Sequence, residues 1–166
     1  MDRRKRKRVI ASIFVIIWMG VIFAYSAQTG GESSTTSMSA SYRLVEATGR
    51  ALGANWQDSE ILSMAVQIEG VIRKLAHMIE YAILSVSVAY ALEIQYRFEP
   101  TKRSWLIRMA GTLLLCFVYA ITDEIHQLFV PGRHGAVRDV LIDSLGALVA
   151  FIILNLIIMI KEKKKQ

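Results

Sequence analysis

Four long apolar stretches, separated by polar segments, dominate the chain. They cover about residues 9–25, 75–94, 105–129 and 140–160. A helix needs about 20 apolar residues to cross the roughly 30 Å of hydrocarbon in a bilayer, and each stretch approaches or reaches that length. We therefore predict an all-α integral membrane protein, a helical bundle with four transmembrane helices. A single domain, residues 9–160, lies between a basic N-terminus (residues 1–8) and a basic tail (residues 161–166).

The polar segment between the first two apolar stretches is too long for a simple turn. Its first part, AQTGGESSTTSMSAS, is small and polar and predicts a loop or the start of a helix. Asp58 then predicts a helix N-cap. Apolar residues follow it at helical spacing: Ile61, Leu62, Ala65, Ile68 and Ile72. This stripe predicts an extracytoplasmic helix at the membrane interface or packed over the spans.

The first apolar stretch has two interpretations. A basic start, an apolar core and the sequence Ala24-Tyr25-Ser26 fit a cleavable signal peptide. The length of the stretch and the presence of Trp18 favour a retained membrane anchor instead.

The distribution of charge predicts the orientation of the spans. The chain has 20 Lys and Arg against 14 Asp and Glu, a net charge of +6. With the N-terminus inside, the cytoplasmic side receives fourteen of those twenty basic residues: Arg3 to Arg8, Arg97, Lys102, Arg103, Arg108, Lys161 and Lys163 to Lys165. This positive-inside bias places both termini in the cytoplasm, with a turn at Pro100 between the second and third spans. Basic residues that directly flank apolar segments contact lipid headgroups, which argues against nucleic-acid binding.

Cys116 is the only cysteine and lies within the third apolar stretch. Because a single cysteine has no second thiol to pair with, an intrachain disulfide and a site of several thiolate ligands are excluded. We predict that Cys116 is a small buried hydrophobic residue.

Most of the charge deep in the sequence, and every histidine, falls in three short segments at the ends of spans: RKLAHMIEY, DEIHQLFVPGRHG and RDVLID. Arg73, His77, Glu80 and Tyr81 share one helix face, with Lys74 beside it. Three further sets follow: Asp123, His126 and Gln127 on one face, Glu124 on its flank, and Asp139 and Asp143 one turn apart. In the predicted orientation, all three segments lie at the outer membrane face. Val130-Pro131-Gly132-Arg133 predicts a tight turn that makes the polar ends of the third and fourth spans neighbours, and we expect the three segments to form one site.

The residue types in this cluster indicate anion binding and acid–base chemistry. Arginine recognises phosphate and carboxylate through two parallel hydrogen bonds, so we expect Arg73, Arg133 and Arg138 to bind an anion. The candidate acid–base groups are His77 or His126 beside Glu80, Asp123 or Glu124. The other candidate ligand-binding residues are Lys74, Tyr81, Gln127, Asp139 and Asp143.

Metal binding is an alternative for the same cluster. Asp123 and His126, and His77 and Glu80, each stand three residues apart on a helix. The chain has no HExxH or comparable signature, so no metal site is predicted. The sequence does not indicate any cofactor.

The order of these motifs resembles the VanZ-like family of bacterial membrane proteins. The matching segments are Tyr25-Ser26-Ala27-Gln28, RK-LAH-x-x-EYA, DE-x-HQ-x-FVPGR and RD-x-x-x-D-x-x-GA. The resemblance as a whole covers about residues 9–151. The resemblance implies a multi-pass protein of the bacterial plasma membrane. It also adds Ser26 and Gln28 to the candidate site. The chain departs from the family where two serines commonly precede the glutamine, and has Thr29 where proline is frequent.

The founding member of that family is associated with low-level resistance to the glycopeptide teicoplanin. The resemblance therefore implies a cell-envelope protein that modulates glycopeptide susceptibility. Its expected partners are membrane lipids and an anionic lipid-linked or cell-wall precursor ligand. Three alternatives are a membrane-embedded hydrolase or transferase acting on such a ligand, a proton-linked transporter, and a purely structural helix bundle. Charges near one end of the spans, rather than at the bilayer midplane, argue against the transporter.

Overall fold

Five helices make up the protein, in a computed structural model that describes residues 2–96 and 101–164. They are α1 (Arg3–Ser26), α2 (Gly30–Leu52), α3 (Asp58–Tyr96), α4 (Lys102–Gln127) and α5 (Val137–Lys163). The chain is 87% helical, with no strands in its described part. All helices except α2 are long and apolar enough to cross a membrane. The predicted fold class, an all-α bundle with four membrane-length helices, is confirmed.

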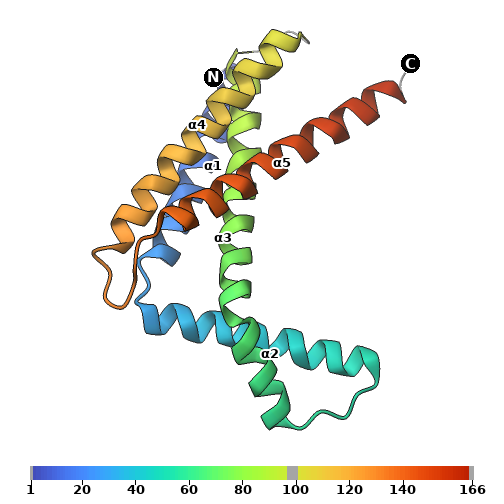
Figure 1. Cartoon of the computed structure of the whole chain (residues 1–166). Coiled ribbons are helices and arrows are strands. Elements are labelled where there is room, and N and C mark those ends of the chain that lie inside the picture. The colour runs from blue at the N-terminus through green and yellow to red at the C-terminus, as the bar shows by residue number, and fades with distance from the viewer. Residues whose placement is uncertain (1, 97–100, 165–166) are drawn as a thin grey trace.

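Helix α3 is the centre of the bundle and contacts each of the other four helices (Figure 1). It packs closely against α5, where the main chains meet at Gly146. A Cβ atom at Gly146 would collide with the main-chain carbonyl of Met78, so only glycine permits this approach. The Ser85 hydroxyl donates a hydrogen bond of 2.8 Å to the Ala147 carbonyl at the same crossing. The core around it includes Tyr81 and the predicted buried Cys116, both 0% exposed.

The predicted outer helix and the predicted second span are one continuous helix. The sequence indicated an outer helix starting near Asp58 and a separate span at about residues 75–94, but α3 runs unbroken from Asp58 to Tyr96. No proline interrupts the join, and a single glycine such as Gly70 costs a helix only about 1 kcal/mol. Asp58 is the first helical residue rather than the cap. The Gln57 N–H, one residue earlier, donates 2.8 Å to the Glu60 carboxylate.

The small polar segment after the first span forms α2, a helix of 23 residues. Its start is capped reciprocally: the Thr29 hydroxyl accepts from the Glu32 N–H, and the Glu32 carboxylate accepts from the Thr29 N–H. Its serine and threonine hydroxyls donate to carbonyls one turn back, for example Ser41 to Ser37 at 2.8 Å. That local bonding allows a polar sequence to pack a serine-rich face on α3.

Helix α2 lies transverse to α3 at one end of the bundle (Figure 1). Val45 of α2 packs there against Ile61 and Ala65 of α3, which belong to the predicted apolar stripe. Leu62 of the same stripe is 50% exposed. The apolar stripe at the start of α3 therefore packs against α2, so the two parts of the outer segment cover each other.

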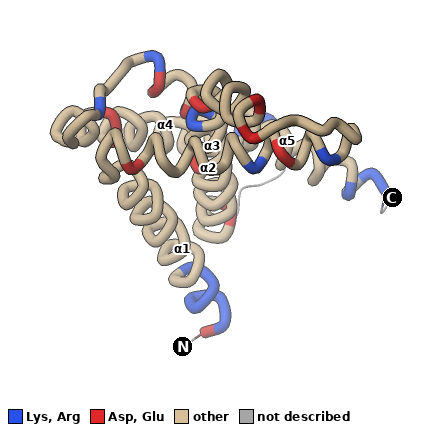
Figure 2. The backbone as a smooth tube through the Cα atoms, turned by 90° about the horizontal axis from the view of Figure 1, so that it is seen from below, with Lys and Arg blue, Asp and Glu red and all other residues tan. Residues whose placement is uncertain are grey.

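Both termini lie at the end of the molecule away from α2 (Figure 1). The basic residues of the N-terminus form the continuous blue start of α1 in Figure 2, and further basic residues lie near the C-terminus at the end of α5. Arg8 donates to the carbonyls of Ile94 and Gln95 at 3.4 and 3.0 Å, which ties the start of α1 to the end of α3. The predicted inner turn at Pro100 and the basic residue Arg97 lie outside the described residues, as does Lys165.

Candidate functional site

Polar side chains from four helices form a cluster inside the bundle, near the end where α2 lies. Helix α3 contributes His77, Glu80 and Tyr81 from its middle. The C-terminal ends of α1 and α4 and the first turns of α5 supply the others: Ser26, Asp123, Glu124, Gln127 and Asp143. Asp123 and Asp143 are only 3% and 1% exposed. The three segments that the sequence predicted to converge therefore do meet, and α1 joins them.

Asp123 is held by two side chains from different parts of the chain. The Ser26 hydroxyl donates 2.7 Å to Asp123 Oδ2, and the Gln127 amide donates 3.2 Å to the same oxygen. The Gln127 amide also donates to Ser26 Oγ at 3.1 Å. These bonds fix the orientation of the carboxylate while Oδ1 has no hydrogen-bond partner among the described residues.

Arg133 fastens the turn between α4 and α5 to the end of α1. Its guanidinium donates to the carbonyls of Gln28 and Tyr25, both at 3.1 Å, and to Gln127 Oε1 at 3.3 Å. Burial lowers the pKa of Arg133 and the nearby charge of Arg73 lowers it further, whereas neighbouring carboxylates raise it. Since the pKa of arginine starts from above 12, Arg133 stays charged at neutral pH.

The other three basic residues predicted to belong to the site either form ion pairs or are exposed. Arg73 forms an ion pair with Glu69 and donates 3.0 Å to Ser34 of α2. Lys74 pairs with Asp139 at 2.9 Å. Arg138 has a side chain that is 76% exposed and lies 4.0 Å from the Asp139 carboxylate. The structure thus places Arg138 at the surface, away from the buried cluster.

The turn before α5 is shaped by two glycines and a carboxylate. Gly132 has a φ of 74°, a left-handed conformation that favours glycine. The Gly30 N–H donates 3.0 Å to the Pro131 carbonyl, and a Cβ at Gly30 would collide with the Gly132 carbonyl. Glu124 accepts 2.7 Å from the Ala136 N–H. Glu124 therefore positions the turn, and the start of α2 is pinned to it.

Two clefts open on either side of this cluster and share Arg73, His77 and Arg133. The first, of about 380 Å³, is lined mainly by apolar groups of α1, α2 and α3, including Trp18, Ile79 and Ile83, with Gln28 and Glu80 at its polar part. The second, of about 320 Å³, is more polar and also contains Lys74, Glu124, Gln127, His134, Asp139 and Asp143. An apolar cleft thus meets a polar one at two arginines and a histidine.

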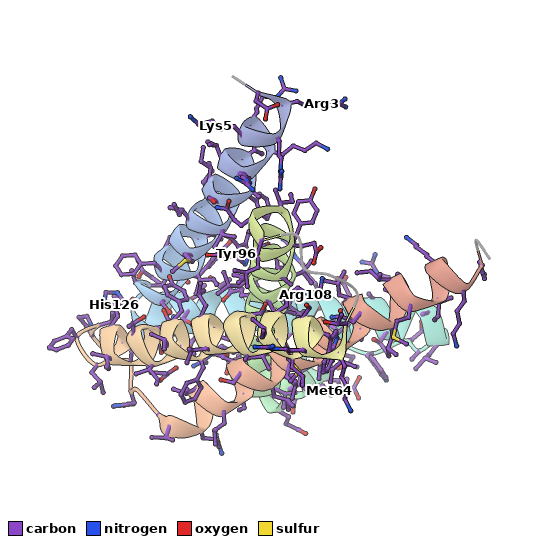
Figure 3. All side chains as sticks on the ribbon, turned by 90° about the horizontal axis from the view of Figure 1, so that it is seen from above. Arg3, Lys5, Met64, Tyr96, Arg108 and His126 are labelled. Atoms are coloured by element: carbon purple, nitrogen blue, oxygen red, sulfur yellow. The ribbon has the colours of Figure 1, made fainter. Side chains whose placement is uncertain are left out.

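His126 lies outside both clefts. Its ring stacks on Phe23 of α1 with ring centroids 4.4 Å apart, and Figure 3 shows it between the ends of α4 and α1. Helical spacing indicated that His126 shares a face with Asp123, but the structure does not bring His126 to the cleft that contains His77. Of the two candidate histidines, His77 therefore has the position suited to chemistry at the cleft.

Sequence reasoning missed three residues that bind Arg73 or its ion-pair partner, one on α3 and two on α2. Glu69, the ion-pair partner of Arg73, also accepts a hydrogen bond from Ser37. The signal for Glu69 was present, since it stands four residues before Arg73 on a helix. Ser34 and Ser37 could not be placed, because their segment gave no firm sign of a helix.

Several buried polar atoms in the cluster have no hydrogen-bond partner within the described ranges. They are Arg73 Nε, His77 Nδ1, Glu80 Oε2, Tyr81 Oη, Asp123 Oδ1 and Asp143 Oδ1. An unsatisfied buried polar atom costs about 1–3 kcal/mol, so purely structural networks are normally fully bonded. Most of the unpartnered buried atoms in the described residues therefore lie in this cluster.

Four helices of membrane length enclose this polar cluster. The protein is therefore a multi-pass helical membrane protein with a buried polar cluster at one end of the bundle. The sequence profile of the VanZ/LLP1 family matches residues 11–158, and the chain belongs to that family. The predicted resemblance is thereby confirmed over most of the chain. No curated protein and no solved structure matches it.

Proposed function

We propose that this VanZ-like protein lies in the bacterial plasma membrane with both termini in the cytoplasm and binds an anionic, phosphate-bearing envelope ligand on the outer side. The ligand is lipid-linked or derived from a cell-wall precursor. Its capture modulates susceptibility to teicoplanin-type glycopeptides, which act on the envelope outside the membrane.

The observation that carries this proposal is the position of Arg73 and Arg133 where the two clefts meet. A lipid-linked phosphate has an apolar chain and a charged head, and the apolar and polar clefts offer a surface for each part. The fixed charge of Arg133 suits phosphate recognition. Arg138 is left out of the binding site because of its exposure.

The unpartnered buried atoms argue against the alternative of a purely structural bundle, because helices can be joined at lower cost by apolar packing. The position of the buried carboxylates argues against a proton-linked transporter, whose binding site would lie near the bilayer midplane. The buried carboxylates Asp123 and Asp143 occupy the ends of α4 and α5 rather than their centres.

The test is teicoplanin susceptibility in a sensitive Gram-positive strain that expresses wild-type protein, Arg73→Ala or Arg138→Ala at equal membrane levels. We expect wild type and Arg138→Ala to shift the inhibitory concentration equally, and Arg73→Ala to lose the shift. Equal shifts in all three strains, or no shift with wild type, would contradict the proposal.

A further inference from the structure

We propose that His77, Asp123 and Asp143 form a binding site for one divalent transition-metal ion, zinc or manganese. The three residues come from α3, α4 and α5, and each offers a ligand atom within 4.8 Å of the other two. Binding of the ion does not require the ligand of the proposed function. The inference reverses the sequence-based expectation of no metal site.

The free atoms of the two aspartates are the strongest support. Asp123 and Asp143 are 3% and 1% exposed, and the Oδ1 atom of each has no hydrogen-bond partner among the described residues. Two buried carboxylates side by side repel each other when both are charged. A divalent cation between them would neutralise that charge and satisfy both oxygen atoms.

The surrounding hydrogen bonds resemble the outer shell of a metal site. Ser26 and Gln127 both donate to Asp123 Oδ2, and Oδ1 is left without a hydrogen bond among the described residues. Glu80 Oε2 lies 3.5 Å from His77 Nδ1, not yet a hydrogen bond, and neither atom has another partner among the described residues. A carboxylate beside one ring nitrogen commonly orients an imidazole whose other nitrogen binds the metal.

The donor set decides between kinds of ion. Carboxylates alone would suit magnesium or calcium, but an imidazole favours first-row transition metals. Zinc bonds of about 2.0–2.2 Å place tetrahedral ligand atoms about 3.4 Å apart, so donors within 4.8 Å need only small side-chain movements. His77 and Asp143 also line the polar cleft, which gives the ion a route of entry.

The site could not be found from sequence spacing. The pairs three residues apart, His77 with Glu80 and Asp123 with His126, suggested ligands on single helices. The structure instead takes one ligand from each of three helices and turns His126 toward Phe23.

The experiment measures metal content in detergent-purified, full-length protein without an affinity tag. Protein stripped with a chelator is dialysed against Zn²⁺ or Mn²⁺, desalted and analysed by mass spectrometry of the elements. We expect about one equivalent per chain for wild type. Asp143→Asn should weaken affinity more than 100-fold, beyond the roughly 10–100-fold effect of outer-shell changes.

Asp58→Asn is the control, because Asp58 stands 19 residues before His77 at the start of α3 and accepts a hydrogen bond of 3.2 Å from the Tyr42 hydroxyl. It should bind metal as wild type does. If Asp143→Asn does not fold, the X-ray absorption spectrum of zinc-loaded wild type decides: scattering from one imidazole supports the site. The proposal is overturned if wild type holds no stoichiometric metal, if the two variants bind equally, or if the spectrum lacks imidazole. In the first case, a proton shared by the two aspartates would be the better account.

Discussion

The hydroxyl of Ser26 donates a hydrogen bond of 2.7 Å to Asp123 Oδ2, across 97 positions of sequence. It joins the last residue of α1 to the last turns of α4, and Ser26 is fully buried. The family resemblance placed Ser26 among the candidate residues without a role. The structure gives it one: to hold the α4 carboxylate that lies near His77 of α3 and Asp143 of α5.

Replacing Ser26 with alanine should destabilise the protein by about 1–3 kcal/mol, because a buried hydrogen bond to a carboxylate is lost. Thermal or denaturant unfolding in detergent would measure this. Ser39→Ala is the control, since the exposed Ser39 hydroxyl donates to the Thr35 carbonyl of its own helix. Equal stability of the two variants would show that the contact contributes nothing.

Two adjacent glycines should respond oppositely to alanine. A methyl group at Gly30 would collide with the Gly132 carbonyl, whereas nothing lies within 4 Å of a Cβ at Gly31. We expect Gly30→Ala to cost about 1–3 kcal/mol through overpacking, and Gly31→Ala to be neutral or stabilising by up to about 1 kcal/mol. Unfolding of both variants checks this. A neutral Gly30→Ala would mean that α2 is not pinned to the α4–α5 turn.

Cysteine labelling should place α2 outside the cell and both chain ends inside. In a Cys116→Ser background, Ser39→Cys should react with a membrane-impermeant thiol reagent added to intact cells. Lys164→Cys should react only after the membrane is opened. The expectation rests on the position of both termini at the end away from α2 and on the basic start of α1 (Figures 1 and 2). The reverse labelling pattern would invert the orientation and move the candidate site to the cytoplasm.

The sequence predicted those parts of the fold that depend on composition and period. Four apolar stretches predicted four membrane-length helices, and helical spacing predicted that His77, Glu80 and Tyr81 share a face of α3. The third span was predicted to end near residue 129, whereas α4 ends at Gln127 and its next residues form the turn.

What the sequence could not predict depends on contacts between distant segments. Helix α2 has little apolar content, and its serines become a packing face only because α3 lies against them. The rotation of each helix about its axis directs His126 to Phe23 and leaves Arg138 exposed. Residue spacing alone does not determine that rotation. Asp143 meets Asp123 and His77 for the same reason.

The most direct test of the central claim is binding of a polyprenyl phosphate to the purified protein, compared with the uncharged polyprenol of equal length. We predict that wild type and Arg138→Ala bind the phosphate at least about tenfold more tightly than the alcohol, a difference of about 1.4 kcal/mol. Arg73→Ala should lose that preference. Equal affinity of wild type for both lipids, or an unchanged preference in Arg73→Ala, would contradict the claim that the arginines at the meeting of the two clefts recognise an anion.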